Sequence, residues 1–236
     1  MTRRFDPADP RGLPLTVCVL LGAICTLAFA VMAQDVVARD GIARADPRLM
    51  SFVVAHRVGW ATSVAQWSTW VGSSFLLIPL ILVVGGYVRA KHHTWTPLVL
   101  LAVSLGGAIA LYNAGKALFD QPRPPGRMRI GDPVPGGSFP SGHTAEAIAV
   151  WGMLAILAAG TMTRRRWLPV AGATLVVLLV GVLRIYLGTH WLSDVLGGYA
   201  LGGAWLSVVV AVTLVRRSSS RASGARSPLP SIREGG

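Results

Sequence analysis

The sequence has few charged residues, and very few of them are acidic. Only 14% of its 236 residues are charged while 53% are hydrophobic, and 10 Asp and Glu stand beside 22 Lys and Arg. Soluble domains carry about 25% charged residues, so the composition excludes a water-soluble globular protein. The net charge of +12 is also seen in nucleic-acid-binding proteins. Here, however, the basic residues lie between apolar runs, so we expect a membrane surface as the partner and no nucleic acid.

Cysteine is scarce as well. Cys18 and Cys25 are the only two cysteines, and both lie in the first apolar run. Along one helix they would be about 10 Å apart, which is beyond the reach of a disulfide bond. The sequence therefore predicts neither a disulfide framework nor a thiolate metal site.

Long apolar runs make up most of the chain. A helix needs about 20 mainly apolar residues to cross the hydrocarbon core of a bilayer. Six stretches meet this requirement: residues 13–34, 71–89, 96–118, 142–162, 167–187 and 193–215. The first is also compatible with a signal peptide, but its apolar run exceeds the roughly 7–15 residues of a signal core, which favours a retained span. The sequence thus predicts an all-α, polytopic membrane protein with six transmembrane helices in a bundle.

Lys and Arg indicate the orientation, because cytoplasmic loops are enriched in them. With the N-terminus inside, the inner segments hold 13 of the 22 basic residues. The strongest single signal is the short loop 163–166, which contains three consecutive arginines. We therefore predict a multi-pass protein of the plasma membrane with both termini in the cytoplasm.

Three regions follow from this layout. Residues 1–12 form a cytoplasmic N-terminal segment, residues 13–215 the six-span domain, and residues 216–236 a basic cytoplasmic tail that we expect to be disordered. The outer segment 48–69 places Val53, Trp60, Val64 and Trp67 on one helical stripe. That stripe predicts either a helix lying in the membrane interface or an extension of the second span.

Polar residues gather at the outer ends of spans three to six. In chain order the set comprises Lys116, Arg123, Ser141, Gly142, His143, Arg184, His190 and Asp194. A charge at membrane depth is costly and indicates a functional site. A single His or Arg at the end of a span is more often an interface anchor, but an ordered set on one surface favours a site, which would face outside.

The cations of this set suit a phosphate ligand. Lys116, Arg123 and Arg184 can surround the phosphoryl oxygens and match their charge. Ser141 and Gly142 lead into a helix whose first amide N–H groups have no internal partner, and Gly142 lets a ligand approach the backbone closely.

Two histidines and a carboxylate add catalytic groups. A neutral imidazole can attack phosphorus, and a second imidazole can protonate the leaving oxygen. Asp194 follows His190 by four residues, so one helical turn would bring its carboxylate beside that ring. There it would orient the imidazole, as the carboxylate of a catalytic triad does.

These residues form three motifs that resemble the signature of the type 2 phosphatidic acid phosphatase superfamily. The motifs are Lys116-x6-Arg123-Pro124, Pro140-Ser141-Gly142-His143 and Arg184-x5-His190-x3-Asp194. That family includes bacterial lipid phosphatases, undecaprenyl diphosphate phosphatases, glucose-6-phosphatases and vanadium haloperoxidases. The resemblance covers residues 95–215, whereas the first two spans match only in layout.

The resemblance implies a role for each residue. His190 would be the nucleophile that forms a phosphohistidine, His143 the general acid, and Asp194 the residue that orients His190. The phosphoryl group would be bound by Lys116, Arg123, Ser141, Gly142 and Arg184, with no metal or cofactor. The third motif often begins with Ser-Arg, but here Leu183 precedes Arg184, which puts in doubt only the hydrogen bonding behind the arginine.

The sequence is compatible with more than one substrate and more than one activity. The substrate is expected to be a lipid phosphate or diphosphate, such as phosphatidic acid, phosphatidylglycerol phosphate or a polyprenyl diphosphate. A phosphotransferase of the same family would use the same phosphohistidine. A lipid-phosphate transporter or binding protein would need the cations but not two histidines with an aspartate, and the apolar spans argue against a haloperoxidase. The sequence does not indicate an oligomeric state.

Three further charged residues have two interpretations each. Glu146 follows His143 by three residues. It either tunes that histidine or binds a head group, or it is simply favoured by the helix dipole. Arg127 and Arg129 contact an acidic head group or, more simply, are solvated loop charges.

Overall fold

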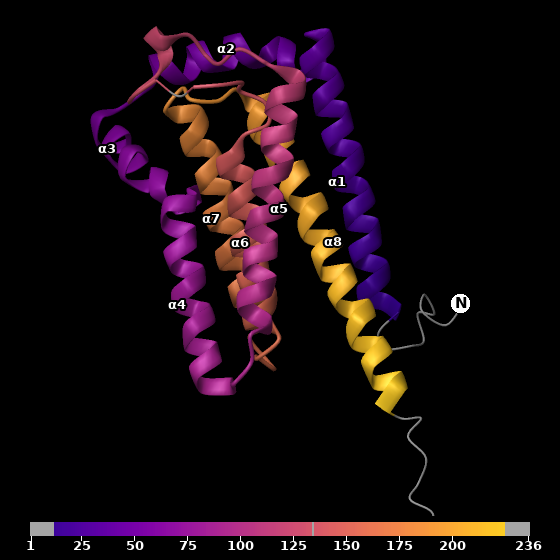
Figure 1. Cartoon of the computed structure of the whole chain (residues 1–236). Helices are drawn as coiled ribbons and strands as arrows, with labels where there is room; N and C mark the ends of the chain where they lie inside the picture. The colour runs from indigo at the N-terminus through magenta and orange to yellow at the C-terminus, as the bar shows by residue number, and fades with distance from the viewer. Residues whose placement is uncertain (1–11, 134, 225–236) are drawn as a thin grey trace, which may run out of the picture.

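The computed structural model describes residues 12–133 and 135–224, and this part of the chain contains helices and loops but no strand (Figure 1). The elements are α1 (Gly12–Ala38), α2 (Gly41–Ala55), α3 (Gly59–Ser68), the 3-10 turn η2 (Thr69–Gly72), α4 (Ser74–His92), α5 (Thr96–Phe119), the 3-10 turn η3 (Gly126–Met128), α6 (Gly142–Ala159), α7 (Trp167–Tyr186) and α8 (Leu192–Gly224).

Six of these helices are long and apolar enough to cross a membrane, which confirms the predicted six-span, all-α architecture. They are α1, α4, α5, α6, α7 and the part of α8 from Leu192 to Arg216. Helix α8 continues to Gly224, so residues 216–224 of the predicted tail are helical. Extending an established helix costs little, since each added residue gains a backbone hydrogen bond. The remainder of the predicted tail, residues 225–236, lies outside the described residues, as do residues 1–11 of the predicted N-terminal segment.

Helix α6 forms the centre of the bundle and packs against α5, α7 and α8. Half of the residues in its membrane-spanning segment are buried inside the protein, compared with 6% of those in α1. Ala145, Ala147 and Ala149 are fully buried, and such small side chains let neighbouring helices approach closely. The residues at the start of α6 are therefore enclosed on several sides.

Helix α1 lies along α8 on the outside of the bundle (Figure 1). The two helices meet at small residues, since Gly22 faces Ser207 and Gly203 faces Cys25. Both cysteines are free. Helix α1 therefore packs as part of the bundle, as expected of a retained span.

Helices α2 and α3 cover one end of the bundle, with α2 lying across it (Figure 1). Residues 48–69 do not form the single helix that both sequence interpretations assume, because the chain breaks between α2 and α3 and turns again before α4. Val53 therefore lies on α2, whereas Trp60, Val64 and Trp67 lie on α3. Trp60 and Trp67 are 75% and 79% exposed, as expected of side chains that face a membrane interface.

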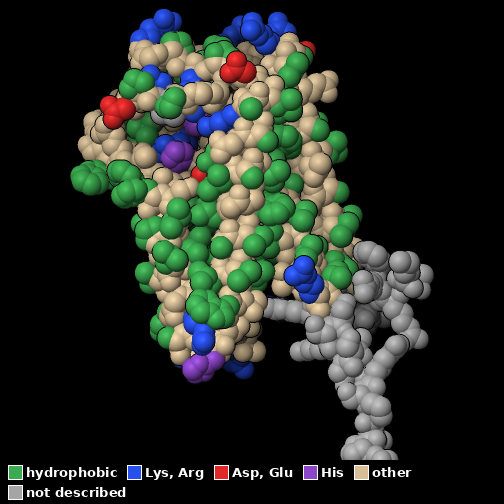
Figure 2. Space-filling model, viewed as in Figure 1, with side chains coloured by type: hydrophobic (Ala, Val, Ile, Leu, Met, Phe, Trp, Pro, Cys, Tyr) green, Lys and Arg blue, Asp and Glu red, His purple; other side chains and the backbone are tan. Residues whose placement is uncertain are grey.

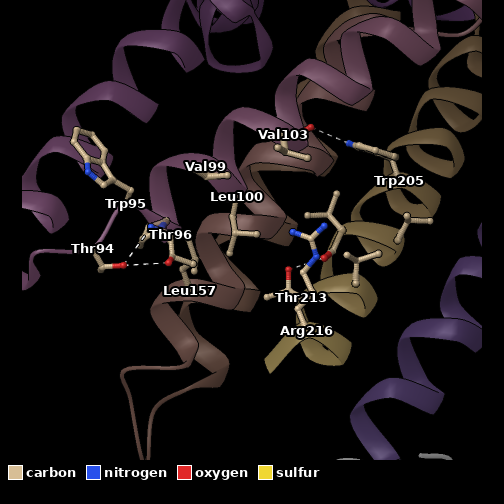
Figure 3. A pocket seen from close by; sticks show the side chains of 14 residues that line it. Thr94, Trp95, Thr96, Val99, Leu100, Val103, Leu157, Trp205, Thr213 and Arg216 are labelled. Carbon is tan, nitrogen blue, oxygen red and sulfur yellow. Dashed lines mark hydrogen bonds between the residues drawn. The ribbon is translucent and has the colours of Figure 1, made fainter. Parts of the chain in front are cut away.

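At the opposite end, α8 diverges from α5 (Figure 1). An apolar cavity of about 790 Å³ lies between these helices (Figure 3). We call it the α5–α8 cavity. Its walls include Val99, Leu100, Val103 and Trp205, and Arg216, at the end of the membrane-spanning part of α8, also lines it. The Trp205 indole Nε1 donates a hydrogen bond to the Val103 carbonyl at 3.2 Å (Figure 3). Its lining contains no histidine or carboxylate, so the acid–base chemistry expected from the sequence must lie elsewhere.

Candidate active site

A small polar cavity of about 250 Å³ lies beneath α2, at the end of the bundle opposite the α5–α8 cavity. Figure 2 shows basic and histidine side chains gathered in a hollow near this end. Six of the eight predicted site residues line it: Lys116, Arg123, Gly142, His143, Arg184 and His190. The other two, Ser141 and Asp194, are fully buried behind its wall. The fold thus brings together residues from α5, α6, α7 and two loops.

The Arg123 side chain joins the two loops that frame this site cavity. Its Nη1 donates to the Thr189 carbonyl at 3.0 Å, and its Nε and Nη2 donate to the Gly136 and Gly137 carbonyls, each at 3.2 Å. Burial lowers the pKa of Arg123, but a guanidinium stays protonated at neutral pH. These bonds fix the guanidinium at the cavity wall and hold loop 120–138 against loop 187–191.

His190 is 3% exposed and is held from behind by Asp194. Its Nδ1 lies 3.3 Å from Asp194 Oδ2, which also accepts hydrogen bonds from the Trp191 backbone N–H at 2.8 Å and from the Ser138 hydroxyl. Burial, followed by the charges of Arg123, Lys116 and Arg184, lowers the pKa of His190 well below its ordinary value. The ring is therefore neutral, with its Nδ1 proton directed at the aspartate and an unprotonated Nε2 that lies 3.3 Å from Arg123 Nη1.

His143 stands in the first turn of α6, where it faces Arg184 from the last turn of α7. Arg184 Nη1 lies 3.3 Å from His143 Nε2, and Arg184 is only 5% exposed. Arg184 Nε is buried with no hydrogen-bond partner among the described residues. This is the region where the family often has a serine and this chain has Leu183, so the departure noted in the motif coincides with an unsatisfied donor.

At the start of α6, Gly142 and Ser141 have packing and hydrogen-bonding contacts that could not be predicted from the sequence. A side chain at position 142 would meet the Tyr112 ring, with the nearest ring atom 3.0 Å from the added carbon. Glycine thus suits the close packing of α6 on α5, because a larger residue would displace the Tyr112 ring by a few tenths of an ångström. The Ser141 backbone N–H donates to the Asp194 carbonyl at 3.0 Å, while its Oγ is buried with no hydrogen-bond partner among the described residues.

Sequence reasoning missed a buried carboxylate on α2. Asp46 is 4% exposed and accepts hydrogen bonds from the Ser193 hydroxyl at 2.5 Å and the Ser193 backbone N–H at 3.2 Å. It therefore caps α8 one residue before Asp194 and ties α2 to the site. Burial raises the pKa of Asp46 to about 6.

Five other residues of the site were not identified from the sequence either. Ser138 bonds Asp194, while Ser73, Ser74, Tyr112 and Thr189 line the cavity. None stands at a spacing from the motifs that signals a role, since serine, threonine and tyrosine are common at span ends. Glu146, which was singled out with two interpretations, also lines the cavity.

Metal binding finds no support in the part of the chain that the structure describes. No three His, Cys, Asp or Glu side chains there lie together in a way that could hold a metal ion. The polar atoms facing the cavity belong mainly to cations and imidazoles, which suit an anionic ligand.

Several known proteins are similar to this chain in sequence. Residues 97–218, about half of the chain, match the model of the PAP2 superfamily. Phosphatidylglycerophosphatase B of Bacillus subtilis is 29% identical over 177 residues, which cover 74% of this chain and 86% of that protein. Lipid A 1-phosphatase of Porphyromonas gingivalis is 34% identical over 161 residues, which cover 63% of this chain and 33% of that protein.

A solved structure gives the same result for the fold. The crystal structure of a transmembrane PAP2-type phosphatidylglycerolphosphate phosphatase from Bacillus subtilis superposes with a TM-score of 0.74 and 28% sequence identity. The match covers 81% of this chain and 95% of that one, so it includes helices that lie outside the matched family model. With three ordered motifs gathered in one cavity and a family model that matches half of its length, the chain belongs to the PAP2 superfamily.

Proposed function

We propose that this chain is a membrane phosphatase that hydrolyses a lipid phosphate or diphosphate through a phosphohistidine on His190. The observation that carries the proposal is the state of His190. Its ring is neutral and buried, with Nδ1 directed at Asp194 and Nε2 at the cavity beside Arg123. An unprotonated imidazole nitrogen beside a guanidinium is suited to attack a phosphorus atom whose oxygens the guanidinium binds.

The phosphoryl group would occupy the site cavity among Lys116, Arg123 and Arg184. These cations reach the cavity from α5, a loop and α7, so they can surround the group from different directions. The N-terminus of α6 adds backbone N–H donors and the positive end of a helix dipole. Gly142 would contribute through this backbone, whereas the Ser141 N–H already donates to the Asp194 carbonyl.

In the first step, His190 Nε2 attacks the phosphorus. A P–N bond forms while the P–O bond to the lipid breaks, and His143, when protonated, gives its proton to the departing oxygen. The imidazole gains positive charge as the bond forms, and Asp194 stabilises that charge through Nδ1. The products of this step are the dephosphorylated lipid and a phosphohistidine.

In the second step, water attacks the same phosphorus. His143 takes a proton from the water, the P–N bond breaks, and inorganic phosphate leaves. His190 returns to its neutral form with its proton still on Nδ1. Every proton in this cycle is accounted for by the two histidines, so the reaction as proposed needs no metal ion.

The position of the site fits a lipid substrate. The acyl or prenyl chain would remain in the bilayer while only the phosphate enters the cavity at the end of the bundle. The relatives act on membrane lipids according to their names, phosphatidylglycerophosphatase B and lipid A 1-phosphatase. In this proposal the arginine-rich loop 163–166 and both termini lie in the cytoplasm, so the site opens on the outer face of the plasma membrane.

The test is phosphate release by the purified protein in detergent, with phosphatidic acid, phosphatidylglycerol phosphate and a polyprenyl diphosphate as substrates. His190→Ala should lower turnover about 10³-fold or more because the nucleophile is lost. The matched control is His92→Ala, an exposed histidine at the other end of the bundle, which should retain wild-type turnover. EDTA should leave the rate unchanged.

Two results would contradict the proposal. Wild-type turnover by His190→Ala would remove His190 as the nucleophile. Phosphate loss from the lipid only when an acceptor alcohol is added would identify a phosphotransferase instead, because the phosphohistidine would then pass to that alcohol rather than to water.

A further inference from the structure

The site cavity has a second polar layer that none of the three motifs contains. Ser74, Tyr112 and Glu146 line it together with the cations and histidines. Helix α6 starts at the site and leads away from it, so Glu146 lies about 4.5 Å deeper than His143 along the axis. Tyr112 precedes Lys116 by four residues on α5, which ends at the site, and lies about 6 Å deeper. We call these three residues the lower layer.

Glu146 is an unusual residue for a cavity that binds phosphate. Its side chain is 5% exposed, and its Oε2 accepts a hydrogen bond from the Ser74 hydroxyl at 2.5 Å. The side chains of Tyr112 and Lys116 also interact with this carboxyl group. A phosphate placed directly beside it would meet a like charge with little water to screen the repulsion. The lower layer therefore does not suit the phosphoryl group itself.

The leaving group is the part of the substrate that would reach this layer. In an in-line displacement the leaving oxygen departs opposite the attacking nitrogen. His190 lies in the loop before α8, at the outer end of the cavity, whereas His143 and Glu146 follow one another along α6. A lipid anchored in the bilayer also enters from the deeper side, since its chains stay in the hydrocarbon core.

We infer that Ser74, Tyr112 and Glu146 form a head-group subsite that accepts a hydroxyl of the leaving alcohol and rejects a second phosphate. The inference rests on the proposed function, and it narrows the substrate class. A carboxylate accepts a hydrogen bond from an alcohol hydroxyl, and the Ser74 hydroxyl occupies that position in the structure. A diphosphate would instead bring its second phosphate against Glu146.

The chemical consequence is a preference among lipid phosphates. A phosphomonoester whose alcohol carries a hydroxyl close to the phosphate, as a glycerol head group does, should be the better substrate. A lipid diphosphate should be the poorer one. A hydrogen bond to a charged group contributes enough binding to change affinity about tenfold or more, so the effect is large enough to measure.

Glu146 could also act only by holding α4 against α6 through Ser74. In that case the carboxylate has no contact with substrate, and its loss would lower the rate on every lipid by a similar factor. A subsite predicts something different, namely a change in the ratio of kcat/KM values between lipids. The ratio therefore separates the two roles.

The experiment uses three lipids with identical acyl chains: phosphatidylglycerol phosphate, its analogue lacking the central head-group hydroxyl, and diacylglycerol diphosphate. Wild-type protein should prefer the first over each of the others by about tenfold or more in kcat/KM. Glu146→Gln keeps the shape but removes the charge, and should raise the diphosphate relative to the monoester by about tenfold. Glu146→Ala should abolish the preference for the head-group hydroxyl.

Two further variants serve as controls. Asp132→Asn removes an exposed carboxylate from the loop after η3 and should leave all three ratios at wild-type values. Ser74→Ala breaks the bond between α4 and Glu146 but keeps the carboxylate, so it should retain the discrimination against diphosphate. If Glu146→Gln and Ser74→Ala lowered the rate equally on all lipids, Glu146 would be an anchor of α4 and the inference would be wrong.

The wild-type ratios test the inference even if the Glu146 variants do not fold. Equal kcat/KM for phosphatidylglycerol phosphate and its deoxy analogue would overturn it without any variant. A faster reaction with the diphosphate would overturn it as well. Failure of the proposed function looks different, because wild-type protein would then release no phosphate from any of the three lipids.

Discussion

Arg184 and Arg165 are the same residue type at the two ends of one bundle, and their surroundings differ. Arg184 is 5% exposed and contacts His143, whereas Arg165 lies exposed in the loop between α6 and α7. His190 and His92 form a similar pair, one buried against Asp194 and the other exposed. The difference shows that residue type alone does not mark a site in a membrane protein. Burial together with polar neighbours does.

The carboxylates follow the same division. Every Asp and Glu in the described part of the chain lies in the half of the bundle that α2 covers, including Asp46, Glu146 and Asp194. The other half has basic residues at its end and the apolar α5–α8 cavity between its helices. One end therefore holds the polar groups that the proposed reaction needs, and the other presents apolar and basic groups that suit lipid and a membrane surface.

The sharpest way to break this comparison is the same substitution at both ends. Arg184→Lys keeps the charge but replaces the planar fork of donors with a single ammonium group. We expect kcat/KM for the lipid substrate to fall about 10- to 100-fold, because phosphoryl charge in the transition state loses preorganised donors. Arg165→Lys should leave kcat/KM unchanged. Melting temperatures of both proteins show whether a loss of rate reflects unfolding, and equal rates would mean that Arg184 only anchors a span.

Much of this division could be predicted from the sequence. The six spans could be predicted because the bilayer sets both the length and the polarity of a crossing helix. The site residues could be predicted because Lys116, His143 and Arg184 are the kind of residue that apolar spans exclude, and the motif spacings give them an order. Their convergence on one cavity agrees with that prediction, while their catalytic roles stay proposals.

The supporting residues could not be predicted, for a physical reason. Asp46 reaches Ser193 across 147 positions, and only the path of α2 over the bundle brings them together. Ser138 and Ser74 are small polar residues in a loop and at a helix start, where serine is ordinary. The break between α2 and α3 was also missed, because the apolar stripe of residues 48–69 fits a single helix by periodicity alone.

Asp46 allows a second test, based on how the stability of the protein depends on pH. Burial raises the folded-state pKa of Asp46 from its ordinary value of 3.8 to about 6, so the fold favours the protonated form. The stability from this group is complete below about pH 4 and is lost as the pH rises through 6. The shift corresponds to at most about 3 kcal/mol.

Asp46→Asn should remove this pH dependence, since the amide keeps the shape and carries no proton that titrates. We expect the melting temperature of wild-type protein to fall between pH 4 and 7 relative to that of Asp46→Asn. Asp40→Asn changes a carboxylate whose side chain is 72% exposed at the same end and should follow the wild-type curve. Parallel curves for wild type and Asp46→Asn would show that Asp46 has an ordinary pKa.

The smallest change in stability is expected at the α5–α8 cavity. Trp205→Phe removes the indole N–H that donates to the Val103 and Ser104 carbonyls at 3.2 and 3.1 Å. Both carbonyls lie inside α5, where they can also accept bonds from the helix backbone, so the loss should be about 1 kcal/mol. That corresponds to a fall of roughly 2–4 °C in melting temperature for a chain of this size.

Turnover of Trp205→Phe should stay within about twofold of wild type. The loss of one hydrogen bond changes the structure mainly around that bond. It would affect the distant site only if the helices had two alternative packing arrangements. The measurement is kcat/KM beside the melting curve. A tenfold loss of rate with intact folding would mean that the spacing of α5 and α8 at the α5–α8 cavity controls Lys116 and Asp194 at the far ends of the same helices. The two ends would then be coupled through these helices, and the α5–α8 cavity would influence catalysis.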